Sequence, residues 1–143
     1  MTASRHPEEA AFAADGDPRT RWATHHPQQP GDWIELTFPA PAPLAGVRLA
    51  TGPTPHDYPR GLRLETSPDG ARWTSPEVTV RTEGALRWGG THLLRDGVAA
   101  LTVTFPPTRT RTLRLTLTAG DGVFDWSIYD LRLLGPAPGA PAQ

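Results

Sequence analysis

The chain alternates apolar and polar residues over several short segments, which is the pattern of half-buried β-strands. In segment 32–38, Ile34, Leu36 and Phe38 face one way, and more polar positions lie between them. Alternation or short apolar runs predict further strands over 44–51, 62–66, 99–105, 112–118 and 126–134. Turn residues separate most of these segments and indicate antiparallel pairing. About seven or eight such strands predict an all-β fold, an antiparallel jelly-roll β-sandwich.

Two other segments have a local signature. Residues 7–14 place Pro in a first turn, follow it with two acidic residues and end in an Ala-rich run, which predicts one short N-terminal helix. The turn 67–70, Ser-Pro-Asp-Gly, predicts a hairpin that carries Trp73 across the turn. Segment 83–97 has the least regular pattern and is expected to be a long loop or an irregular hairpin. We expect Trp22, Trp33, Trp73 and Trp126 in the core.

The length of 143 residues fits one domain with a hydrophobic core. We assign residues 1–135 to one β-sandwich domain and the Pro/Ala-rich residues 136–143 to a tail or linker remnant. The absence of Cys excludes thiol catalysis, thiolate metal sites and disulfides. A net charge of −1 argues against nucleic-acid binding, which requires a basic surface. No apolar run of about 20 residues predicts a membrane-spanning helix.

The run ADGDPRTRW, residues 14–22, contains oxygen-bearing side chains and then a large aromatic residue. One interpretation is a plain turn that leads Trp22 into the core. The other is an oxygen-lined cation site, because Asp15, Asp17 and Thr20 supply hard oxygen ligands of the kind that calcium prefers. A single loop cannot surround an ion, and Asp130, within an apolar run near the end of the chain, is the candidate that would complete the site. The spacing alone leaves both interpretations open.

Five motifs occur in an order that is specific for one family: AxDGDxxTRW at 13–22, GDWIEL at 31–36, SPDGxxW at 67–73, RxLRLT at 111–116 and WSIYDLRL at 126–133. In this combination the chain resembles the discoidin, or coagulation factor V/VIII type C, domain. The resemblance covers about residues 3–135. It implies the galactose-binding domain-like fold, which also includes bacterial carbohydrate-binding modules.

The resemblance also implies a structural calcium ion between the first turn and the last strand. The residues that match the ligand positions of the family are Phe12, Asp15, Asp17, Thr20, Tyr129 and Asp130. At the last of these positions the family usually has Glu. Asp130 is shorter by one methylene, so its contact with the ion could be direct, through water, or absent.

In such domains, loops at one end of the sandwich form a shallow ligand site. The matching loops, 23–29, 55–60 and 120–126, offer His25, His26, His56, Asp57, Arg60 and Phe124 as ligand-binding residues. A structural alternative for the second loop has Tyr58 packed inward and Arg60 paired with Asp57. A metal site at the His25–His26 pair is disfavoured, because adjacent residues rarely point at one ion.

The sequence lacks a G-x-S-x-G elbow and any triad of nucleophile, base and acid on recognisable elements, which argues against an enzyme. The prediction is a non-catalytic carbohydrate-binding module for galactose, hexosamine or related glycans. We expect a monomeric module of a larger extracellular, periplasmic or cell-surface protein. The alternative is a structural or protein-interaction domain for adhesion or scaffolding. The Pro, His and Gln of the loops disfavour membrane lipid as the partner.

Overall fold

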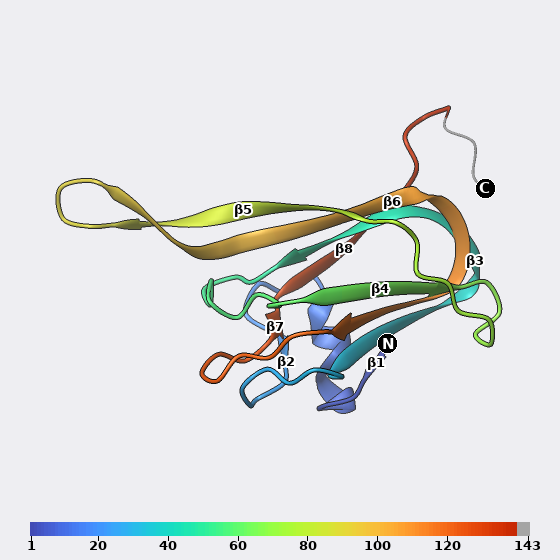
Figure 1. Ribbon diagram of the computed structural model, residues 1–143, viewed down its shortest axis with the longest axis horizontal. Coiled ribbons are helices and arrows are strands. Elements are labelled where there is room, and N and C mark those ends of the chain that lie inside the picture. The colour runs from blue at the N-terminus through green and yellow to red at the C-terminus, as the bar shows by residue number, and fades with distance from the viewer. Residues whose placement is uncertain (140–143) are drawn as a thin grey trace.

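The computed structural model describes residues 1–139, and two long, bent strands organise the fold. These are β3 (Trp33–Ala50) and β6 (Leu93–Leu117), which pair antiparallel along most of their length. Both strands curve sharply at one end of the molecule, so each takes part in both layers of a β-sandwich (Figure 1). The predicted all-β antiparallel sandwich is confirmed.

The shorter strands extend the two layers. In one layer, β1 (Thr2–Ala3) and β4 (Leu62–Ser67) flank the first part of β3 and the last part of β6. In the other layer, β8 (Asp130–Leu134) and β5 (Thr79–Trp88) flank the remaining parts of the same two strands. A separate antiparallel pair joins β2 (Trp22–Ala23) to β7 (Ser127–Ile128).

The prediction of separate strands over 32–38 and 44–51 was wrong, because both belong to β3. Likewise, 99–105 and 112–118 belong to β6. The Pro-rich linking segment of β3 pairs with β6 alone. The missing N–H groups of Pro41 and Pro43 therefore interrupt no hydrogen bonds to a second neighbouring strand. The predicted strand 126–134 is instead divided at Tyr129, because β7 pairs with β2 and β8 pairs with β3.

The alternating apolar positions form the core as predicted. Ile34 and Leu36 of β3 are buried against Leu113, Leu115 and Leu117 of β6 and its neighbours. The indole rings of Trp22 and Trp126 are fully buried and meet edge to face, with 5.0 Å between their centroids. This contact ties the start of the domain to its end.

Trp33 and Trp73, which the sequence analysis placed in the core, are only half-buried. The guanidinium of Arg114 lies over both rings, 5.2 Å from the centroid of Trp33 and 4.3 Å from that of Trp73. The same guanidinium donates two hydrogen bonds to Glu35 Oε2. These two aromatic residues therefore cover a charged side chain on the outer face, where a cation–π contact needs no full burial.

The remaining local predictions are confirmed with refinements. The short N-terminal helix is a 3-10 helix, η1 (Pro7–Ala13), with Ala10 and Ala13 buried. After the turn 67–70 the chain returns only through an isolated antiparallel bridge between Thr66 and Thr74. Segment 83–97 is an irregular hairpin with register shifts, formed by β5 and β6, and it projects beyond the sandwich (Figure 1). Of the helices in the described residues, none has the length and apolar character needed to span a membrane.

Residues 136–139 lie in no helix or strand; Pro136 is half-buried and 137–139 are exposed. Residues 140–143, the rest of the predicted tail, lie outside the described residues.

Candidate ligand-binding site

Loops from three parts of the chain meet at one end of the sandwich (Figure 1). The loop between β3 and β4 carries His56 and Arg60, and the loop between β6 and β7 carries Phe124. The rings of His56 and Phe124 stack with 5.0 Å between centroids and an interplanar angle of 24°. The guanidinium carbon of Arg60 lies 5.5 Å from the Phe124 centroid. The structure thus brings together three of the six predicted ligand-binding residues.

The side chain of Arg60 is held in place on several sides. Its Nε donates to Asp121 Oδ2 at 2.7 Å, and its Nη1 donates to the carbonyl oxygen of Tyr58 at 2.8 Å. The guanidinium also lies over the Tyr58 ring at 4.0 Å. Pairing of Arg60 with Asp57 is therefore wrong, and the ion-pair partner is Asp121. Within the described part of the chain Nη2 has no hydrogen-bond partner, so it can donate to a bound molecule.

Asp121 also shapes the loop that presents Phe124. Its Oδ1 accepts hydrogen bonds from the backbone N–H groups of Val123 at 2.8 Å and Phe124 at 3.0 Å. These two backbone donors, first that of Phe124, and the Arg60 guanidinium lower the pKa of the Asp121 carboxyl. One carboxylate therefore orients both the aromatic ring and the guanidinium. Asp121 was not among the predicted site residues, although Asp before Gly in a loop is a recognisable turn signal.

Gln28 lies beneath the patch and connects all three loops. Its side chain is buried and donates from Nε2 to the carbonyl oxygens of Tyr58 and Asp125, both at 2.9 Å. Its Oε1 accepts the backbone N–H of Arg60 at 3.1 Å. Gln in a polar loop carries no sequence signal for burial, so only the fold identifies this role.

The base of the β5–β6 hairpin borders the patch through Asp96. Its carboxylate lies 3.1 Å from His56 Nε2 and accepts a hydrogen bond from Arg87 Nε at 2.8 Å. The Arg87 hydrogen bond is the main cause that lowers the pKa of Asp96. Gly97 permits this approach, because its φ is +87° and an added Cβ would lie 2.3 Å from the Pro55 carbonyl oxygen. Asp96 was not among the predicted site residues.

The side chains of His25 and His26 have partners away from the patch. His25 Nε2 lies 2.8 Å from a carboxylate oxygen of Glu9 in η1. His26 Nδ1 lies 2.7 Å from the carbonyl oxygen of Pro27, and its buried Nε2 faces Asp32 at 3.8 Å. The two histidines therefore do not join the cluster of His56, although their loop reaches the same end of the sandwich.

Asp57 likewise contributes to the fold and not to the exposed patch. Its Oδ2 accepts a hydrogen bond from the Ser127 hydroxyl at 2.6 Å and lies 3.9 Å from Arg21 Nη1. Its carbonyl oxygen accepts the backbone N–H of Ser127. Asp57 thus fastens the β3–β4 loop to β7, which leaves little of its carboxylate for a ligand.

The predicted cation turn is tightly hydrogen-bonded. Asp15 Oδ2 accepts the Thr20 hydroxyl at 2.8 Å, and Oδ1 accepts the backbone N–H of Asp17 at 2.9 Å. The Asp17 carboxylate pairs with Arg19 at 2.8 Å, and that side chain lowers its pKa. Gly16 has a φ of +80°, a backbone conformation that the turn requires.

The last strand lies directly beside this turn. A hollow of about 290 Å³ is lined by Gly16, Asp17, Pro18, Tyr129, Asp130 and Arg132. Asp130 pairs with Arg132 at 2.6 Å. The oxygen atoms of the turn and of β8 suit a hard cation such as calcium, but two of the carboxylates already have arginine partners. Phe12, whose carbonyl the resemblance implies as a ligand, precedes this turn at the end of η1.

Comparison with known proteins identifies the family and the fold. The F5/8 type C domain family model matches residues 1–130. No curated protein sequence shows significant similarity to the chain.

Solved structures with this fold are similar over nearly the whole chain. Chitosan-binding module 1 of a chitosanase/glucanase from Paenibacillus sp. IK-5 is 20% identical, with a TM-score of 0.66, over 94% of this chain and 92% of that chain. CpGH89CBM32-5 from Clostridium perfringens, in complex with GalNAc-β-1,3-galactose, is 20% identical, with a TM-score of 0.66, over 93% and 92%. The family 32 module of C. perfringens NanJ, in complex with galactose, is 16% identical, with a TM-score of 0.64, over 92% and 90%. At these identities the similarity establishes the fold.

Proposed function

We propose, because the chain belongs to the F5/8 type C domain family, that it is a non-catalytic carbohydrate-binding module whose ligand site is the patch of His56, Arg60 and Phe124. The observation that carries the proposal is the stacked His56–Phe124 pair beside the Arg60 guanidinium, whose Nη2 has no hydrogen-bond partner within residues 1–139. The C–H face of a sugar ring packs on the face of an aromatic ring, and its hydroxyls need donors and acceptors at the rim.

The patch supplies both kinds of contact. Phe124 is 36% exposed although His56 covers one side of it, so the free part of Phe124 and the outer side of His56 remain for a sugar ring. Arg60 Nη2 can donate to a hydroxyl, and the carboxylates of Asp121 and Asp96 can accept from others. Arg60 pairs with Asp121 and Arg87 pairs with Asp96, so the charges at the rim are balanced. This balance favours neutral galactose or N-acetylhexosamine units over strongly charged sugars.

The affinity of one such site is expected to be weak. Few contacts are available on a shallow patch, and both partners must lose water, so we expect a Kd on the order of 0.1–1 mM, or about −4 to −5.5 kcal/mol. A weakly binding module is still useful when it is linked to other domains, because it raises their local concentration at a glycan surface. We therefore propose a place in a larger extracellular, periplasmic or cell-surface protein.

The test is an NMR titration of the ¹⁵N-labelled domain with galactose, N-acetylgalactosamine and N-acetylglucosamine oligomers. Saturable shifts are expected at Arg60, Asp121, Phe124 and their neighbours, with Thr108 and Arg109 on the opposite bend of β6 as internal controls. No shift for any sugar at about 20 mM, well above the expected Kd, would contradict the proposal. Shifts confined to other surfaces would contradict the assignment of the ligand site to this patch.

We also propose that calcium occupies the turn of Asp15, Asp17 and Thr20 beside Tyr129 and Asp130. What supports this is the set of oxygen atoms that two distant segments place around one hollow. Calcium would supply only structural stabilisation there, because it would hold the first turn against the last strand. Direct coordination by the carboxylate of Asp17 or Asp130 would require that side chain to exchange its arginine partner for the ion.

A protein-interaction role is the second candidate, and the β5–β6 hairpin favours it. Leu86, Trp88 and Leu93 near its tip are each about 60% exposed or more. A protruding apolar tip is typical of surfaces that contact another macromolecule. Trp88→Ser tests this role. If it abolishes contact with the other domains of the parent protein or with its target, while the NMR shifts caused by sugar persist, the hairpin serves an interaction that is separate from the sugar patch.

A further inference from the structure

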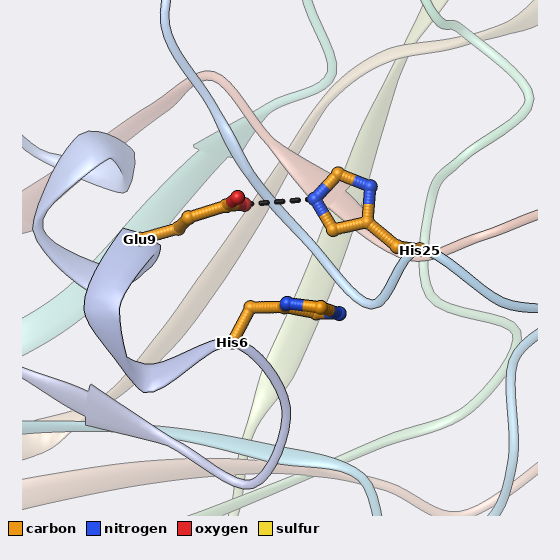
Figure 2. A group of neighbouring side chains, drawn as sticks. All are labelled: His6, Glu9 and His25. Carbon is orange, nitrogen blue, oxygen red and sulfur yellow. Dashed lines mark hydrogen bonds and ion pairs between the residues drawn. The ribbon is translucent and has the colours of Figure 1, made fainter.

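We propose that His6, Glu9 and His25 form a binding site for a divalent transition-metal ion of the zinc class. The three side chains come from two segments, His6 and Glu9 at η1 and His25 after β2, and they converge on one space (Figure 2). Each offers one ligand atom, and these atoms lie within 4.8 Å of one another. The site is separate from the proposed sugar patch and from the oxygen-lined turn.

The donor set selects the kind of ion. Two imidazoles and one carboxylate suit zinc and neighbouring transition metals, whereas calcium requires six to eight oxygens. Three protein ligands leave one tetrahedral position for water or for a donor of another molecule. Zinc bonds of about 2.0–2.1 Å would place the ligand atoms about 3.3 Å apart, so the group must close slightly around an ion.

The side chains have the freedom that this closure needs. The imidazole of His6 is 40% exposed, that of His25 41%, and the Glu9 side chain 30%. The His6 and His25 rings already meet edge to face, with 4.6 Å between centroids. Glu9 Oε2 and His25 Nε2 form a 2.8 Å contact that a shared ion would replace.

The backbone supports a specific role for both histidines. In the described residues, His6 and His25 are the two non-glycine residues with positive φ, at +46° and +54°. Neighbouring contacts hold the backbone of His25 in this conformation. The Thr24 hydroxyl donates to the carbonyl oxygen of His26 and accepts the backbone N–H of Trp126. Backbone strain of this kind concentrates at functional sites, and both strained residues belong to the group whose ligand atoms converge.

The surrounding charges are compatible with a cation. Glu8 lies 3.3 Å from His6 Nδ1 and adds negative charge beside the site. The guanidinium of Arg5, the nearest basic side chain along the chain, pairs with Asp32 at 3.1 Å. An ion at this position would clamp the 3-10 helix to the loop that follows β2.

The test is calorimetric titration of ZnCl₂ into the untagged domain in excess calcium, so that zinc is kept from any cation site at the oxygen-lined turn. We expect one zinc ion per chain, and Co²⁺ should give the visible absorption of a tetrahedral complex. His6→Asn and His25→Asn should each weaken zinc binding about tenfold or more, and Asn tolerates the positive φ that both positions require. His92→Asn, at the exposed hairpin tip, is the matched control and should leave binding unchanged.

A measurement on the unmodified chain covers the case in which a variant fails to fold. Zinc should shift the imidazole ¹⁵N resonances of His6 and His25 and leave that of His92 in place. No saturable binding at about 1 mM zinc, or equal weakening by His92→Asn and His25→Asn, would overturn the proposal. Shifts confined to His26, His56 or His92 would overturn it as well.

Discussion

The rings of His56 and Phe124 stack with 5.0 Å between their centroids and an interplanar angle of 24°. The two residues belong to different loops, which strands β4, β5 and β6 separate in the sequence. Neither ring could hold this position through local sequence alone. Asp96 lies against the imidazole, and Asp121 fixes the backbone under the phenyl ring.

Phe124→Ala should weaken sugar binding about tenfold or more and leave folding nearly unchanged. Removing the ring takes away the flat apolar surface, and loss of one stacking contact of about 1.5 kcal/mol corresponds to about tenfold in Kd. NMR titration and thermal unfolding measure the two effects. Val123→Ala, next to it and more exposed, is the control; equal loss in both variants would contradict a specific platform.

Arg60→Lys should bind sugar as poorly as Arg60→Ala. The guanidinium bonds Asp121 and the Tyr58 carbonyl at the same time, a geometry that the single ammonium of Lys cannot reproduce. Calorimetry with the best sugar of the panel would measure this. Arg63→Lys, an exposed arginine on β4, is the matched substitution. Full binding by Arg60→Lys would mean that only charge matters.

Sugar binding and the order of the 120–126 loop should be lost in acid. The pKa of Asp121 is lowered in the folded state. The stabilisation by its carboxylate is therefore complete above the ordinary Asp pKa of about 3.9. It disappears as the pH falls through the lower pKa of the folded state. Amide shifts of Val123 and Phe124, followed from pH 6 downward, should report this. In Asp121→Asn the same resonances should lose that dependence.

Calcium should stabilise the domain by mass action. At free calcium 100-fold above its Kd, the gain in unfolding free energy is about 2.7 kcal/mol, which a chelator should remove. Asp15→Ala should abolish the stabilisation by calcium, because the Asp15 carboxylate accepts hydrogen bonds from the Thr20 hydroxyl and the Asp17 N–H and organises the turn. Asp69→Ala, in the Asp-Gly turn at 67–70, should retain it. A melting temperature that does not respond to chelator would identify a plain turn.

Gln28→Ala should destabilise the fold by about 1–3 kcal/mol, because two carbonyl oxygens and one N–H lose a buried partner. Denaturant unfolding measures this loss. The exposed neighbour Gln29→Ala should change the stability by less than about 0.5 kcal/mol. Sugar binding should also weaken in Gln28→Ala, because the three loops would no longer be held together. Unchanged stability would show that water replaces the side chain.

The candidate site shows how far motif matching reaches. Loop positions inferred from the family resemblance included His56, Arg60 and Phe124, which do meet, but also His25 and Asp57, which contact Glu9 and Ser127. In the sequence all five are polar or aromatic residues in loops, so nothing separated exposed side chains from those that tie loops together. The same limit hid Gln28, Asp96 and Asp121.

The sequence by itself determined the strands and their buried faces, because alternation records which side of a strand meets water, as Ile34, Leu36 and Leu113 show. Only the tertiary structure decided that β3 and β6 run through both layers, that Trp33 and Trp73 cover Arg114, and that His6 meets His25. These relationships join residues far apart in the chain. Local propensity carries no information about them, because the packing of the two layers sets which loops lie side by side.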